Sequence, residues 1–250
     1  MHRAEKERLM ESLANNWSWL ALAFVGSYLI GSIPWAYIIV RTVTGGDVTD
    51  HGTGNVGAMN VRRSTGSWAW FVAAMAADAL KGIVPVALAK TALFTMPSLL
   101  LVPNGKIITG LGETGEVLAY IPLAAMLAVA GAVLGHNYSI WMAIIKRGFH
   151  RTGKGLATGG GALLAYDWRY FVIVIVVGLS AIALTRYLLA GQVAAAASLP
   201  IGAVALGSPD WQFALLIGAM VYAAHHKRFI GMLKGKEPKL YINDRMGPRG

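Results

Sequence analysis

The sequence contains no cysteine, which excludes disulfide bonds, catalysis by a thiolate and cysteine-ligated metals. Charged residues are also scarce, at 14% of the 250 residues, whereas 56% are hydrophobic and the mean hydropathy is +0.54. A soluble domain usually has about 25% charged residues. The composition therefore predicts a polytopic membrane protein, and no soluble domain, low-complexity tract or internal repeat interrupts it.

Acidic residues are outnumbered, with 12 Asp and Glu against 22 Lys and Arg, for a formal net charge of +10. In a soluble protein such an excess would suggest nucleic acid as a partner. In so hydrophobic a chain it indicates basic cytoplasmic loops beside anionic headgroups, so we expect membrane lipid and no nucleic acid. The first 16 residues are too charged for a cleavable signal peptide, and the apolar run after them is too long for a signal h-region.

Apolar segments predict an all-α fold of about seven transmembrane helices, one of them short. The segments are residues 17–43, 68–94, 117–145, 155–166, 170–185, 187–206 and 211–225. Pro34 should kink the first segment. The fourth is too short to span ~30 Å of hydrocarbon, so it should lie against protein or water. We expect a polar extension over 1–16, one membrane domain over 17–226 and a basic tail over 227–250.

The distribution of basic residues predicts how the chain is oriented. If the N-terminus is outside, 15 Lys and Arg fall on the inner side and six on the outer side, with Lys81 inside the membrane. The positive-inside rule then predicts an outside N-terminus and a cytoplasmic C-terminus. It also places the polar, glycine-rich segments together on the cytoplasmic side.

Two glycine-rich segments have the residue types that bind anions. Residues 51–60 read HGTGNVGAMN, in which close glycines can group backbone N–H donors and two asparagines add side-chain donors. Arg63 follows with a planar fork suited to phosphate. Residues 151–161, RTGKGLATGGG, combine glycine, lysine and the start of a helix. Flexible turns are the alternative interpretation, but two such segments on one side favour a phosphate site.

Ionisable residues inside apolar segments need a reason, because a charge in hydrocarbon costs at least ~2.5 kcal/mol. Asp78 and Lys81 are three residues apart, so they can pair on one helix face. The pair is either purely structural, or it holds Lys81 toward a polar cavity. His136, in GHNYS, is either a catalytic base or a hydrogen-bonded packing residue. The spacing gives no metal site and no Ser-His-Asp arrangement.

Five motifs together resemble one family. They are GSIP (31–34), HGTGNVGAMN (51–60), DALKGIVP (78–85), GHNYS (135–139) and GKGLAT (153–158). Their order and spacing, over roughly residues 26–237, resemble the bacterial acyl-phosphate:glycerol-3-phosphate acyltransferases, the PlsY family. The resemblance implies a multi-pass inner-membrane enzyme with its active site facing the cytoplasm. It would move an acyl chain from acyl phosphate to the 1-hydroxyl of glycerol 3-phosphate, giving lysophosphatidic acid and phosphate in phospholipid synthesis, with no cofactor.

The resemblance also implies a set of site residues. The catalytic candidates are Ser32, Asn55, His136 and His225. The phosphate-binding candidates are Thr53, Gly54, Asn60, Arg63, Lys81, Lys154 and Gly155. The acyl-chain length, the exact acceptor and the oligomeric state stay open.

This chain departs from the family pattern in several places. Thr53 replaces a serine and Met59 a threonine, and residues 140–152 form a longer connection that lacks a doubled glycine before the lysine. Lys227 and Arg228 replace the glutamate and asparagine that follow the histidine of the last motif. This change favours a second hypothesis, a catalytically weakened paralogue that binds lipid phosphate. An anion transporter is a third, although the outer segments hold seven acids against six bases, which makes a poor funnel for anions.

Overall fold

The computed structural model describes the backbone of residues 3–95, 100–101 and 121–235, and the side chains of 17–91, 123–223 and 228–235. Its helices are α1 (Arg3–Gly31), α2 (Trp35–Thr44), α3 (Ala58–Thr65), α4 (Trp68–Thr95), α5 (Leu123–Asn137), α6 (Ile140–Ile145), α7 (Leu156–Tyr166), α8 (Trp168–Thr185), α9 (Leu188–Ala205) and α10 (Trp211–Leu233), with a 3-10 turn, η1 (Val48–Asp50). The only strands described, β1 (Leu100–Leu101) and β2 (Ile121–Pro122), form one short antiparallel pair. The predicted all-helical fold is confirmed.

Within the part of the chain that the structure describes, five stretches are long and apolar enough to cross a membrane. They are Trp17–Thr44, Trp68–Thr91, Leu123–Ile145, Trp168–Thr185 and Leu188–Ala205. Two shorter apolar helices, Leu156–Tyr166 and Trp211–Ala223, correspond to the fourth and seventh predicted segments. Each of the seven predicted segments thus contains a helix, although Ile121–Pro122 near the start of the third segment form β2. The number of segments that cross the bilayer stays a prediction.

Two of the predicted segments are broken rather than continuous. The first is interrupted at residues 32–34, because Pro34 has no N–H to continue α1, and the chain restarts as α2. The third is interrupted at residues 138–139, between α5 and α6. The boundaries at the ends also differ from the predicted ones, since α1 already begins at Arg3 and α10 continues to Leu233. The division into extension, domain and tail stays a prediction.

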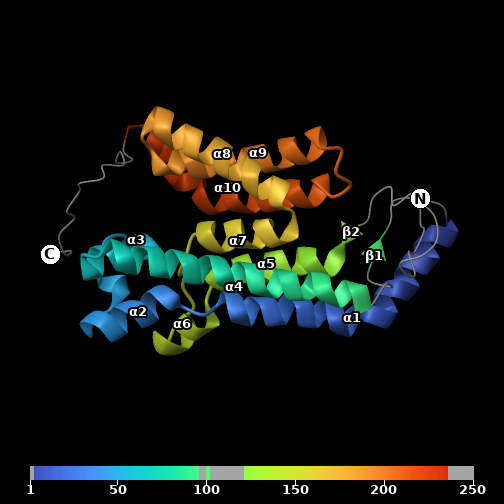
Figure 1. The fold of residues 1–250 in the computed structure, drawn as a ribbon, viewed down its shortest axis with the longest axis horizontal. Coiled ribbons are helices and arrows are strands. Elements are labelled where there is room, and N and C mark those ends of the chain that lie inside the picture. Colours follow the sequence, from blue (N-terminus) through green and yellow to red (C-terminus); the bar gives the residue numbers. More distant parts are fainter. Residues whose placement is uncertain (1–2, 96–99, 102–120, 236–250) are drawn as a thin grey trace.

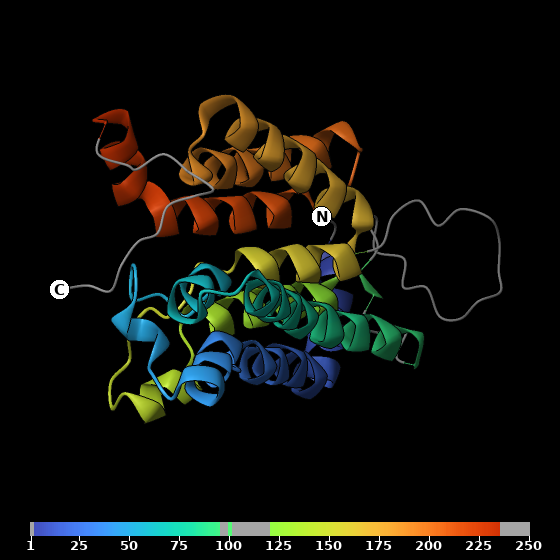
Figure 2. The same cartoon turned by 60° about the vertical axis from the view of Figure 1, so that its left-hand side comes forward.

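The helices form two layers (Figures 1 and 2). Helices α1, α4, α5 and α7 make one layer, and α8, α9 and α10 lie over α7 as the other. A buried cluster of Val86, Val129, Leu163 and Leu199 joins α4, α5, α7 and α9. Glycine permits close contact inside the first layer, since a Cβ on Gly82 would overlap the carbonyl of Thr158 on α7.

The short helix α7 is fixed at its C-terminal end. Lys90 Nζ donates to the carbonyls of Ala165 and Tyr166, 2.9 Å from each, and so satisfies acceptors that the end of the helix leaves open. The hydroxyls of Tyr166 and Tyr170 both donate to the buried carboxylate of Asp210. These bonds anchor the C-terminal end of α7, whereas its N-terminal end points toward the opposite side of the molecule (Figure 1).

The polar connections between helices lie at that opposite side of the molecule. Helices α2, α3 and α6 lie at the left of Figure 1, together with the start of α7, whereas α1 begins at the right. The start of the chain and the glycine-rich segments are thus at opposite ends of the bundle, as predicted. Which end faces the cytoplasm stays a prediction.

Candidate functional site

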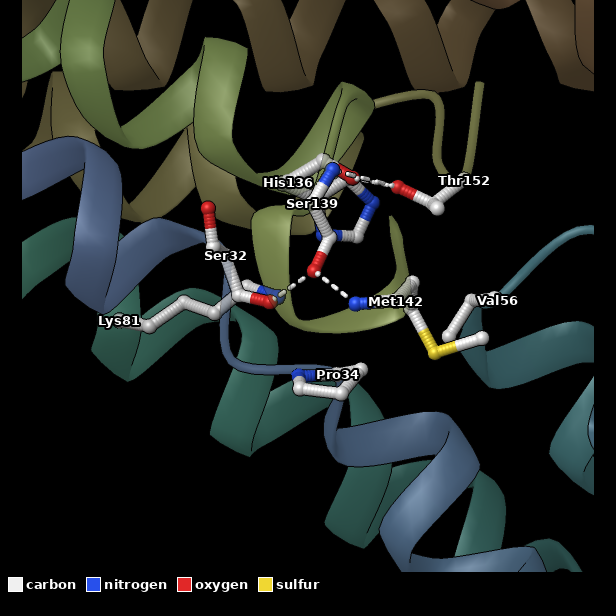
Figure 3. Close-up of a pocket in the computed structure, with 8 residues that line it drawn as sticks. All are labelled: Ser32, Pro34, Val56, Lys81, His136, Ser139, Met142 and Thr152. Atoms are coloured by element: carbon white, nitrogen blue, oxygen red, sulfur yellow. Dashed lines mark hydrogen bonds between the residues drawn. The ribbon is translucent and has the colours of Figure 1, made fainter. Parts of the chain in front are cut away.

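The break between α1 and α2 brings the backbone of Ser32 into a buried polar cluster (Figure 3). The freed carbonyl of Ser32 accepts a hydrogen bond from Ser139 Oγ at 2.5 Å, and that of Ile33 accepts one from Lys81 Nζ at 2.7 Å. Ser32 has no exposed surface, and its own hydroxyl has no partner among the described residues. That hydroxyl is thus a buried polar group whose hydrogen-bonding capacity is unused.

Asp78 lies between two other ionisable side chains. Its Oδ1 atom is 2.9 Å from Lys81 Nζ and 3.7 Å from His136 Nδ1. All three side chains are buried, with residue exposures of 3%, 5% and 7% for Asp78, Lys81 and His136. The predicted pairing of Asp78 and Lys81 is confirmed. Lys81 has three N–H donors, and Asp78 and the carbonyl of Ile33 accept two of them.

The break between α5 and α6 supplies a hub that links the elements of the site. Ser139 Oγ accepts from Met142 N at 3.2 Å and caps α6, and Ser139 N donates to Thr152 Oγ1 at 3.2 Å. Thr152 Oγ1 donates in turn to the carbonyl of His136 at 2.8 Å. Ser139 and Thr152 are absent from the predicted site, although GHNYS and RTGKG contain them. Their role depends on contacts across the chain that no local pattern shows.

The two predicted anion-binding segments lie against each other. Val56 N donates to the carbonyl of Thr152 at 2.7 Å, and Thr152 N donates to the carbonyl of Asn137 at 2.8 Å. Residues far apart in sequence thus form one surface next to the Ser32 cluster.

Several hydrogen-bond donors of the first glycine-rich segment bind carbonyl groups of that same segment. The Asn60 amide donates to the carbonyls of His51 and Asn55, at 2.9 and 2.8 Å, and accepts from Arg63 Nη1 at 2.8 Å. Gly54 N donates to the carbonyl of His51 at 3.0 Å. In this structure Asn60 and Gly54 therefore shape the loop, and direct phosphate contacts from them stay predictions.

Thr53 is exposed on the same loop, and Arg63 and the Asn55 side chain are half-buried. Burial lowers the pKa of the Arg63 guanidinium, but an arginine side chain stays protonated at neutral pH. Arg63 is thus a positive charge held in a fixed direction by Asn60.

The second segment passes directly over the imidazole of His136. A Cβ on Gly153 would overlap the Cδ2 and Nε2 atoms of that ring, so only glycine fits this path. Gly155 has φ = +73° and caps the start of α7, where the first backbone N–H groups have no partner within the helix. Lys154, between them, is half-buried.

Two spaces adjoin these residues. The inner one is lined by Ser32, Pro34, Val56, Lys81, His136, Ser139, Met142 and Thr152, and is too tight for a water molecule (Figure 3). The outer one has about 350 Å³ and is lined by Thr49, Gly54, Val56, Met142, Lys146, Gly148, His150, Arg151 and Thr152. They share Val56, Met142 and Thr152, so the outer cavity lies immediately outside the inner cluster.

The remaining candidates lie at the edge of what the structure describes. His225 is on α10, but its side chain and that of Lys227 fall outside the described residues. Among the described side chains, no group of three or more His, Asp or Glu is placed to hold a metal ion. The absence of a cofactor stays an expectation.

These observations define an integral membrane protein of helices with a buried polar site assembled from two helix breaks and two glycine-rich loops. The chain belongs to the glycerol-3-phosphate acyltransferase family, whose model matches residues 21–235.

Its relatives and its structural neighbours agree with this membership. The glycerol-3-phosphate acyltransferase of Desulforudis audaxviator is 32% identical over 85% of this chain and 91% of its own length. That of Synechococcus sp. strain JA-3-3Ab is 34% identical over 89% of this chain and 95% of its own. The fold resembles the crystal structure of PlsY (YgiH), an integral membrane glycerol 3-phosphate acyltransferase, in its glycerol 3-phosphate form. The TM-score is 0.69 at 26% identity, over 89% of this chain and 96% of that one.

Proposed function

We propose that the protein transfers an acyl chain from acyl phosphate to the 1-hydroxyl of glycerol 3-phosphate. The acyl C–O bond to phosphate breaks, an ester bond forms to the hydroxyl oxygen, and the hydroxyl proton leaves with the phosphate. The products are lysophosphatidic acid and orthophosphate. The observation that carries the proposal is the Ser32, Lys81 and His136 cluster beneath two glycine-rich loops, in a chain of this family. The similar PlsY has structures in glycerol 3-phosphate and lysophosphatidic acid forms.

The chemistry explains why cations rather than a strong nucleophile gather here. An acyl phosphate is a mixed anhydride with a good leaving group, so it needs held geometry and positive charge for the developing phosphate. We assign that charge to Lys81, Arg63 and Lys154. The unpartnered hydroxyl of Ser32 would orient the acceptor.

His136 and Asn55 would complete the polar surface, and the Asp78 carboxylate would keep Lys81 in place. Thr53 and Gly155 would add donors from the two loops, and His225 from α10. The inner space has to widen when substrate enters, because it is closed without one.

A weakened paralogue that binds lipid phosphate is the second candidate. Lys227 and Arg228 favour it, because they replace two polar residues of the last family motif. Purified protein incubated with acyl phosphate and labelled glycerol 3-phosphate separates the two: formation of lysophosphatidic acid supports the enzyme, and bound lipid without product supports the paralogue.

Removing either loop cation should impair the reaction strongly. Arg63→Ala and Lys154→Ala should each lower kcat/KM by about 10- to 150-fold, because losing a hydrogen bond to a charged group costs about 1.5–3 kcal/mol. Arg62→Ala is the matched control, since Arg62 has the same charge one residue away but lies over the Trp68 ring, 4.8 Å from its centroid. Unchanged kinetics in both loop variants would mean that the loops are only turns.

We also propose that the protein resides in a bacterial inner membrane with this site on the cytoplasmic side. The basic bias of the polar segments supports this orientation. Because the chain has no cysteine, a single introduced one reports its own position. In intact cells, a membrane-impermeant thiol reagent should label Leu206→Cys, at the far end of α9, but not Thr53→Cys. Both residues are exposed in the structure. The reverse labelling would overturn the orientation.

A further inference from the structure

Among the described residues, basic side chains and no acidic ones line the outer cavity. Lys146, His150 and Arg151 line it, together with Thr49 and Thr152. Its volume of about 350 Å³ corresponds to roughly twelve waters at about 30 Å³ each, so a small phosphate compound fits. A cleft lined by side chains of positive charge attracts small anions.

A strained turn builds this wall. Helix α6 ends at Ile145, and Arg147 adopts a left-handed conformation with φ = 51°, which is uncommon for a residue other than glycine. Gly148 N then donates to the carbonyl of Ala143 at 3.0 Å, which closes the turn. The turn leads residues 148–151 around the cavity, while Arg147 itself is not in the lining.

The wall is built mainly by one connecting segment. Residues 140–152 form the connection that is longer than the family pattern, and they contribute Met142, Lys146, Gly148, His150, Arg151 and Thr152 to the lining. Most of the lining of the outer cavity therefore comes from this one connection.

The carboxylate of Asp47 lies next to the outer cavity and neutralises part of its positive charge. Asp47 forms an ion pair with Lys146 and also accepts from Thr49 N and Thr49 Oγ1, at 2.8 and 2.6 Å. Burial would raise the pKa of Asp47, but the hydrogen bonds from Lys146 and Thr49 outweigh it and hold that pKa below its usual value. Asp47 is thus charged at neutral pH and offsets part of the positive charge of Lys146.

We propose that this cavity is a binding chamber for small phosphate dianions immediately outside the reaction site. In terms of the proposed function on which it rests, the dianion is glycerol 3-phosphate on its way in or orthophosphate on its way out. Thr152, Val56 and Met142 separate the chamber from Ser32 and Lys81, so an anion held here is one layer of side chains from the reacting groups.

Separate substitutions of Lys146 and Asp47 distinguish anion binding by the cavity from a purely structural role of their ion pair. Lys146→Gln should weaken binding of labelled orthophosphate to the purified full-length protein by about 3- to 10-fold, since it removes a partly exposed cation. Asp47→Asn should strengthen it by about 2- to 3-fold, because it removes the opposing charge, while asparagine still caps the turn. Arg147→Asn removes a charge from the same turn but outside the lining, and asparagine tolerates the left-handed conformation. It should leave binding unchanged.

The measurement is equilibrium dialysis in detergent, repeated in a Lys81→Met background so that the inner site is impaired. Opposite effects of Lys146→Gln and Asp47→Asn support the chamber. Equal losses in both would show that the pair merely holds the loop, and absence of binding in the Lys81→Met background would also overturn the proposal.

Kinetics then identify the anion. A raised KM for glycerol 3-phosphate in Lys146→Gln indicates the acceptor, and a raised inhibition constant for orthophosphate alone indicates the product. If the wild type binds orthophosphate in the chamber but forms no lysophosphatidic acid, the proposed reaction fails and the anion site does not.

Discussion

Replacing Lys81 with methionine is expected to lower kcat by about 100- to 1,000-fold, the effect of losing one preorganised donor to developing charge. Methionine keeps an unbranched side chain of similar length, so packing between α1 and α4 should change little. The ammonium group is lost, and with it the bonds to Asp78 and to the carbonyl of Ile33. The measurement is steady-state kinetics of lysophosphatidic acid formation by the purified variant.

Lys90→Met is the matched control for this prediction. Lys90 is on the same helix and is likewise hydrogen-bonded, but its two acceptors are carbonyls at the far end of α7. Its loss should lower thermal stability and leave kcat within about 3-fold, since distant sites act independently.

A double variant distinguishes a catalytic role of Lys81 from its role in neutralising the buried Asp78 carboxylate. Lys81→Met with Asp78→Asn removes the unpaired buried carboxylate, which should recover stability. A kcat restored along with stability would contradict a catalytic part for Lys81.

The local features of the site were predictable, and the reasons are geometric. Asp78 and Lys81 share a helix face because their spacing is fixed by the helical repeat. The interruption near Pro34 follows from the missing N–H of proline. The second interruption, at Ser139, was not predicted, because the apolar run continues through residues 140–145 and hides it.

The contacts that join distant segments were beyond local patterns. Ser139 donates a hydrogen bond to the carbonyl of Ser32, 107 residues away in the sequence. Both ends of the Asn60 side-chain amide are hydrogen-bonded within its own segment rather than directed toward a ligand. A motif shows which residue types are present, but it does not show which donors are already occupied.

The two helix breaks explain how so polar a site exists inside an apolar bundle. A break in a membrane helix frees backbone carbonyls that must find donors within the protein. Here the carbonyls freed at Ser32 and Ile33 accept from Ser139 and Lys81, which belong to α5–α6 and α4. The same hydrogen bonds that satisfy the backbone therefore bring the candidate reacting groups together.

The loop over His136 leads to the second large expected effect. Gly153→Ala should lower kcat/KM by about 100-fold, because a misplacement of about 1 Å in a positioned site has that cost. The added methyl would overlap the His136 ring and also lie 2.7 Å from the His136 carbonyl oxygen. Either the ring or the segment with Thr152 and Lys154 has to move. Steady-state kinetics and the melting temperature of the purified variant measure the effect.

Gly160→Ala is the control for this prediction, since its methyl would meet only Phe171 at an ordinary distance of 3.7 Å. Inside α7 alanine is favoured over glycine, so this variant should keep its activity and gain slight stability. His136→Ala combined with Gly153→Ala identifies the group that moves. If the ring is displaced, the double variant should be no worse than His136→Ala alone, because neighbours that share one contact are not additive. If the two losses instead multiply, the displaced group is the loop with Lys154. Wild-type kinetics in Gly153→Ala would show that the path of this loop over His136 has no part in the reaction.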